Sequence, residues 1–135
     1  MLFRVAVFLV SSFFLVLSHS ANAMTTGEEL YKICQLFQAS KNKSLFIKMS
    51  SSEMILVGRC AGFVEAFPSG YMFGHAVATQ TPASPGCYQP AKTTIDDVIG
   101  AIMRRYERSR VELKNRPAEV LMLLALRDEL PCKNK

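Results

Sequence analysis

The residues that could support catalysis in this chain are few, and none stands in a pattern that marks an active site. His75 is the only histidine after residue 23, and no sequence context identifies it as the base of a nucleophile. The chain has no Gly-x-Ser-x-Gly, no His-Glu-x-x-His and no phosphate-cradling glycine loop. The acidic pair Asp96 and Asp97 suits the first turn of a helix. The sequence therefore predicts no catalytic residue and no cofactor, and nothing in it requires an enzyme.

The four cysteines are better suited to disulfides than to a metal. They are Cys34, Cys60, Cys87 and Cys132, and an even number in a small exported chain indicates disulfide bonds. A metal site is not predicted, because there is no Cys-x-x-Cys and only one histidine in the same region. Three pairings are open. Cys87 precedes one apolar-periodic segment and Cys132 follows the next, which favours a clasp between them and leaves Cys34 with Cys60.

The N-terminus has the three regions of a secretory signal peptide. Arg4 is followed by an apolar run at 5–17 and by small residues at 21–23 that suit a cleavage site. The run is shorter than the roughly 20 apolar residues that cross a bilayer. We expect residues 1–23 to be removed on export; a cytosolic protein that starts at Met24 is the alternative.

Residues 24–135 suit one small domain. The whole chain has a net charge of +5, but its basic residues are scattered and no run of five like charges occurs. Nucleic acid is therefore a poor candidate partner. A mildly basic surface would favour an acidic one. We expect no membrane contact once the signal peptide has been removed.

Apolar residues at helical spacing predict an all-α fold, a bundle of about four helices stapled by two disulfides. The expected helices cover residues 26–39, residues 52–67, a segment that begins after Thr94, and a segment from Pro117 that ends before Pro131. Thr26 and Glu29 form a capping-box pattern at the first helix. Residues 45–49 could be a strand-like or a helical piece.

Two features of the second predicted helix concern its neighbours. Gly58 and Gly62 share a face and each costs about 1 kcal/mol relative to alanine, so we expect another helix to approach closely there. Cys60 lies on a different face and can turn toward the first helix. Pro68 should end the helix.

The stretch at 68–90 is rich in proline and glycine and has no clear period. A short helix at 70–79 remains open, and residues 79–86 are expected to form an exposed loop. Long loops in compact domains are commonly functional. The alternative is a plain connector whose aromatic residues fold back onto the core.

Several motifs in succession resemble the Rap1a/Tai family of type VI secretion immunity proteins, over roughly residues 28–132. They are Gly-Arg-Cys-Ala-Gly-Phe at 58–63, Cys-Tyr-Gln-Pro at 87–90, a helix from 94 to 106, a Leu- and Ala-rich helix from 117, and Leu-Pro-Cys at 130–132. The chain departs from the family in Phe63, where tyrosine is common, and in its arginine-rich segment 104–110. Because of the arginine-rich segment, the resemblance does not identify which effector the protein would bind.

The resemblance implies a periplasmic, helical, disulfide-bonded protein, commonly a homodimer, that neutralises a peptidoglycan amidase delivered by neighbouring bacteria. Inhibition would be steric, with the immunity protein in the substrate groove of the amidase. A protruding loop is suited to entering a groove, and aromatic side chains are common interface anchors. The expected contact residues are therefore Tyr71, Phe73, His75, Thr79, Gln80 and Thr81. Alternatively, Tyr71 and Phe73 belong to the core.

A function from a different class also fits these features. A general periplasmic stress or chaperone-like binding protein would be equally small, helical and disulfide-bonded. A gene for a secreted cysteine amidase next to the gene of this protein would favour the immunity function.

The predicted clasp can be tested by peptide mapping of the non-reduced protein. We expect one peptide pair joined through Cys87 and Cys132 and another through Cys34 and Cys60. A pair joined through Cys34 and Cys132 would overturn this pairing.

Overall fold

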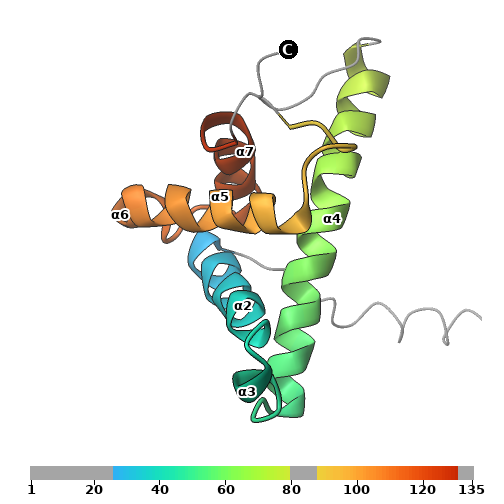
Figure 1. The fold of residues 1–135 in the computed structure, drawn as a ribbon. Helices are drawn as coiled ribbons and strands as arrows, with labels where there is room; N and C mark the ends of the chain where they lie inside the picture. The colour runs from blue at the N-terminus through green and yellow to red at the C-terminus, as the bar shows by residue number, and fades with distance from the viewer. Residues whose placement is uncertain (1–25, 80–87, 131–135) are drawn as a thin grey trace, which may run out of the picture.

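A computed structural model describes residues 26–79 and 88–130. Within these residues the chain is entirely helical, as the sequence predicts, and no strand occurs (Figure 1). The helices are α2 (Gly27–Ser40), α3 (Lys43–Phe46), α4 (Ser51–Thr79), α5 (Ile95–Arg108), α6 (Arg110–Leu113) and α7 (Ala118–Asp128). None of these helices is long and apolar enough to cross a lipid bilayer.

The long helix α4 runs along the whole molecule, and the other helices gather on one side of it (Figure 1). Helix α2 packs on α4, and α7 packs on α5, which lies across α4 (Figure 1). The described residues therefore do not form a regular four-helix bundle. The short helices α3 and α6 extend the lower end of α2 and the far end of α5.

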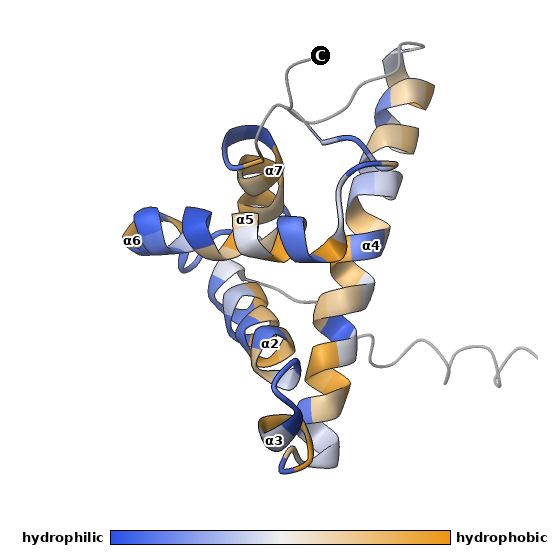
Figure 2. Ribbon diagram, in the orientation of Figure 1, coloured by the Kyte–Doolittle hydropathy of each residue, from blue (hydrophilic) through white to orange (hydrophobic). Residues whose placement is uncertain are grey.

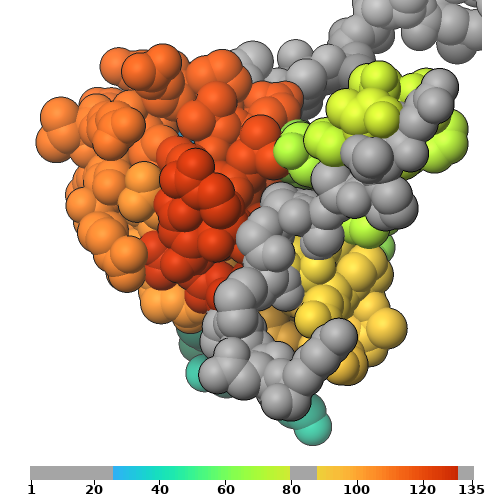
Figure 3. Space-filling view, turned by 90° about the horizontal axis from the view of Figure 1, so that it is seen from above, coloured from blue at the N-terminus to red at the C-terminus, as the bar shows by residue number. Residues whose placement is uncertain are grey.

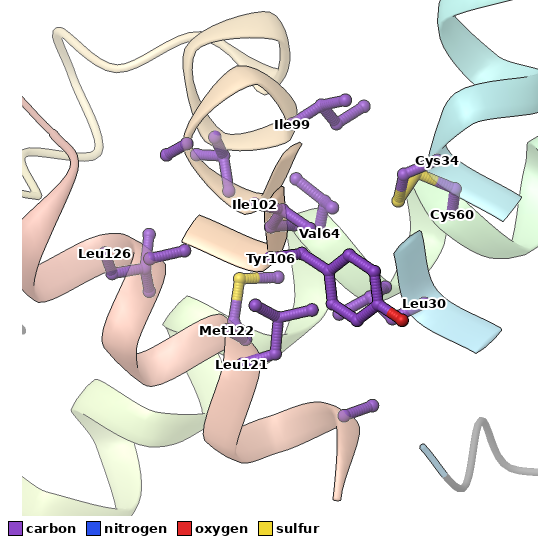
Figure 4. Packing of buried hydrophobic residues seen from close by; sticks show 14 of the residues in the cluster. Leu30, Cys34, Cys60, Val64, Ile99, Ile102, Tyr106, Leu121, Met122 and Leu126 are labelled. Carbon is purple, nitrogen blue, oxygen red and sulfur yellow. A yellow bond between two sulfur atoms is a disulfide. The ribbon is translucent and has the colours of Figure 1, made fainter. Parts of the chain in front are cut away.

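The core lies where α2, α4, α5 and α7 meet. Figure 4 shows side chains from all four helices pointing toward one another there. The fully buried members include Leu30, Ile99, Ile102, Tyr106, Leu121, Met122 and Leu126. Tyr106 also stacks on Tyr31, with ring centroids 4.3 Å apart. Three of these residues, Leu121, Met122 and Leu126, belong to α7, so the last helix is central to the core.

Two of the predicted helix starts, those at Thr26 and Thr94, are correct because they depend on local hydrogen bonds. The Thr26 hydroxyl accepts from the backbone N–H of Glu29, whose carboxylate accepts from the backbone N–H of Thr26. Thr94 and Asp97 form the same reciprocal pair at the start of α5. Each capping box satisfies backbone donors that the first helical turn leaves free.

The predicted stop at Pro68 is wrong, because α4 continues through it to Thr79. Proline in a helix interior lacks an N–H and costs about 3 kcal/mol. Here the Pro68 ring is fully buried, and burial of apolar surface offsets part of that cost. Residues 70–79 are therefore helical, as the open alternative for this stretch allowed, but they continue α4 and do not form a separate short helix. Of the loop expected at 79–86, only Thr79 is described, and it ends α4.

The disulfide expected between the first two long helices is present. Cys34 of α2 and Cys60 of α4 are bonded, with their Cα atoms 5.2 Å apart and both residues fully buried. Cys60 thus faces α2, as its place on the helix predicts. Cys87 and Cys132, the other predicted pair, lie outside the described residues.

The predicted close approach at Gly58 and Gly62 is wrong. A Cβ added at either position would meet no atom within 4 Å. The close approach occurs instead at Gly27, where an added Cβ would lie 2.5 Å from the backbone oxygen of Leu113. The N–H of Gly27 also donates to the carbonyl of Arg116 over 2.8 Å. Gly27 therefore brings the start of α2 against the segment that joins α6 to α7.

The disulfide closes a loop with a sequence separation of 26. Replacing both Cys34 and Cys60 with alanine should lower the free energy of unfolding by about 3 kcal/mol, since the unfolded chain regains the entropy of an open loop. Urea unfolding followed by circular dichroism measures this change. An unchanged midpoint would show that the packing of α2 on α4 alone sets the stability.

The glycines provide a matched pair of substitutions. Gly27→Ala should destabilise the protein by about 1–3 kcal/mol, because the new methyl group clashes with the backbone of Leu113. Gly62→Ala should stabilise it by about 0.5–1 kcal/mol, because alanine favours a helix and the site is open. Urea unfolding of both variants tests this, and effects of the same sign would contradict it.

Candidate protein-binding surface

The structure places four of the six predicted contact residues on a helix instead of a loop. Tyr71, Phe73, His75 and Thr79 all lie in the last turns of α4, which are at the edge of the molecule in Figure 3. Gln80 and Thr81 lie outside the described residues. A helix holds its side chains in fixed directions, so these residues cannot all contact one partner in the way a loop would allow.

Tyr71, His75 and Thr79 follow one another at intervals of four and interact along the helix. The ring centroids of Tyr71 and His75 are 6.2 Å apart. The Thr79 hydroxyl donates to the backbone carbonyl of His75 over 2.8 Å, and its oxygen lies 3.0 Å from Nδ1 of His75. Which of the two atoms donates in this second contact depends on the tautomer of His75. His75 is therefore engaged within its own helix.

Phe73 points in another direction and is 73 % exposed. The alternative that it belongs to the core is wrong, whereas Tyr71 is half-buried. Phe73 belongs to a face that runs the length of α4 on the side away from the buried Cys60, Val64 and Pro68. This face, which we call the open face of α4, comprises the exposed residues Ile55, Gly58, Gly62, Ala66, Ser69, Gly70, Phe73 and Val77, together with the half-buried Arg59.

The open face is mostly apolar although it lies on the solvent side of α4, which is unusual for a surface helix. Ile55 is 65 % and Val77 is 66 % exposed, and the ribbon of α4 is mostly apolar along its length in Figure 2. An amphipathic surface helix normally shows polar residues to solvent, so an apolar outer face indicates a surface that another molecule covers. Gly58, Gly62, Ala66 and Gly70 recur at intervals of four, so the sequence did indicate that they share one face of the helix. It did not indicate that this face is exposed to solvent.

A second exposed apolar group lies at the opposite end of α4 and includes α3. We call it the α3 tip: Leu45, Phe46, Ile47 and Met54. Beside it, Ser40, Lys43, Phe46 and Ile47 line a shallow hollow of about 340 Å³. Sequence reasoning left residues 45–49 undecided and did not identify this surface.

The arginine-rich segment 104–110 is partly used within the protein. Arg104 donates to the backbone carbonyl of Glu129 over 3.1 Å, and Arg108 forms an ion pair of 2.8 Å with its carboxylate, whose side chain is only 4 % exposed. A hydrogen bond from Arg127 lowers the pKa of Asp128. Arg104 and Arg108 therefore hold the end of α7 against α5, which makes them less suitable as partner contacts.

The described residues also indicate which chemistry the surface offers. In residues 26–79 and 88–130, no three His, Cys, Asp or Glu side chains gather in a way that could hold a metal ion. What the exposed surfaces do provide is apolar area on rigid helices, which suits binding to a macromolecule. No protein family, no curated protein and no solved structure matches the chain.

Proposed function

We propose that this protein is a periplasmic immunity protein that binds a type VI-secreted peptidoglycan amidase and blocks its substrate groove. The proposal combines the sequence resemblance, the predicted signal peptide and the exposed apolar surfaces. The observation that carries it is the position of Phe73, a large aromatic side chain that is 73 % exposed at the end of a long helix. Exposed aromatic residues in such places are common interface anchors.

The support of α4 makes a steric inhibitor physically reasonable. The Cys34–Cys60 disulfide and the buried Val64 fix the middle of α4 to the rest of the molecule. Phe73 and Val77 project from the same helix, whose backbone is ordered before any partner binds. A preformed surface loses less conformational entropy on binding, and this favours affinity.

A second candidate function is a chaperone-like periplasmic binding protein. The observation that favours it is the extent of the open face, whose apolar residues span α4 from Ile55 to Val77. A surface of that kind could accept apolar segments of many proteins. The two functions differ in selectivity. Inhibition of one amidase without suppression of the aggregation of unrelated unfolded proteins favours immunity, and the reverse result favours the chaperone-like function.

The resemblance also implies a homodimer, which we include in the proposal. Sedimentation velocity at several protein concentrations measures the molar mass and so distinguishes a monomer from a dimer.

The immunity function predicts a specific effect of Phe73. Phe73→Asp should weaken binding to the cognate amidase by about 30-fold or more, as expected for loss of an interface hot spot worth roughly 2 kcal/mol. Calorimetric titration and a peptidoglycan-cleavage assay with increasing inhibitor measure this loss.

The matched control is Val111→Asp on α6, because Val111 is apolar and 96 % exposed but distant in sequence from α4. It should bind and inhibit like the unaltered protein. If Phe73→Asp inhibits equally well, the end of α4 is not the contact surface. If the unaltered protein neither binds nor inhibits the amidase, the immunity function is wrong.

A further inference from the structure

The α3 tip combines large exposed apolar side chains with unpaired positive charge. Its most exposed member is Ile47 at 82 %, and Leu45, Phe46 and Met54 are each nearly half exposed. Three of these apolar residues are consecutive in the chain. A surface of this kind normally marks contact with a protein or with a membrane.

The charges around the α3 tip are mostly positive. Lys43 and Lys48 are exposed, and no acidic side chain among the described residues forms an ion pair with either of them. Lys41 is nearby but pairs with Asp96. The one acid of this segment, Glu53, accepts hydrogen bonds from the N–H and hydroxyl of Ser50, which lower its pKa. The tip therefore complements a negatively charged surface.

The backbone of the tip is already hydrogen-bonded. The N–H groups of residues 45–49 all donate to carbonyls of residues 42–46, at distances between 2.9 and 3.2 Å. Moving backbone groups into an apolar medium is costly only when they lack partners. The apolar side chains of α3 can thus enter a lipid interface without leaving these donors unsatisfied.

From these observations we propose that the α3 tip docks the protein onto an anionic lipid surface. Leu45, Phe46 and Ile47 enter the boundary between headgroups and acyl chains, while Lys43 and Lys48 extend their long stems and keep their ammonium groups among lipid phosphates. The shape favours lipid over a protein partner, because α3 lies at the end of the molecule (Figure 1). A protruding end that carries exposed lysines complements the negative charge of an anionic bilayer, which needs no preformed groove to accept it.

This docking departs from the expectation that the exported protein has no membrane contact. Docking of this kind needs no membrane-spanning segment, because the helix lies in the interface. The proposal is independent of the immunity function. Phe73 lies 22 residues after the start of α4, or roughly 33 Å along the helix at about 1.5 Å per residue, so the two surfaces are well separated.

Co-flotation with vesicles tests the proposal. The protein is expressed from its full coding sequence and purified in the form that the host yields, and its N-terminus is determined. It is then mixed with vesicles of phosphatidylglycerol and phosphatidylethanolamine, or of phosphatidylcholine alone. We expect flotation with the anionic vesicles and little with the neutral ones, and we expect added salt to weaken it by screening.

Two pairs of variants separate the apolar from the charged contribution. Ile47→Asp should lower the vesicle-bound fraction about 10-fold or more, because it removes apolar burial and adds repulsion, while Val111→Asp should leave it unchanged. Lys43→Glu combined with Lys48→Glu should weaken partitioning by at least about 30-fold. Lys92→Glu, an exposed lysine away from the tip, should have a much smaller effect.

All these positions are exposed, so the variants should retain the helical circular dichroism and the urea midpoint of the unaltered protein, which is checked first. Failure of the unaltered protein to float with anionic vesicles would overturn the proposal. Equal losses for the tip variants and their controls would also overturn it, because binding would then follow net charge alone. A concentration-dependent dimer that Ile47→Asp abolishes, without flotation, would show that the tip binds protein.

Discussion

The rest of the structure depends on the buried junction between α2 and α4 at Cys34 and Cys60. Both sulfur atoms are shielded from solvent, and the bond lies beside the cluster that also holds Leu30 and Val64 (Figure 4). Through α2, this junction connects α4 to α5 and α7, which pack on each other. Without the disulfide, only the packing of buried residues such as Val64 and Pro68 would hold α4 against the other helices. The outer face of α4 has little that could fix the orientation of the helix, because a Cβ added at Gly58 or Gly62 would meet no atom within 4 Å.

The attachment of its inner side to the rest of the protein explains how α4 can carry an exposed apolar face. An isolated helix with apolar residues all round would collapse onto other apolar surface or aggregate. In this protein the inner side of α4 is fixed by the disulfide and by the burial of Val64 and Pro68. The small residues Gly58 and Gly62 expose little side-chain area on the outer side, so the apolar surface available to solvent is concentrated at Ile55, Phe73 and Val77.

The parts of the fold that sequence could predict are those decided by residues near one another in the chain. Thr26 with Glu29, and Thr94 with Asp97, form hydrogen bonds over three residues, so their pattern alone locates two helix starts. The facing of Cys60 toward α2 also followed from helical spacing. These features need no knowledge of what lies across the core.

The errors concern residues whose effect depends on tertiary surroundings. Pro68 usually ends a helix, yet here its ring is buried and the helix continues. Gly58 and Gly62 could equally mark close packing or an open face, and only the position of the neighbouring helices decides between them. The same ambiguity affected the candidate site, because Phe73 was grouped with Tyr71 as if on a loop. On a helix, two residues apart means nearly opposite directions, so one faces solvent while the other stacks along the helix. A partner that binds the open face of α4 would therefore contact Phe73 and Val77 together. It would not contact Tyr71 and His75, which lie on another face of the helix.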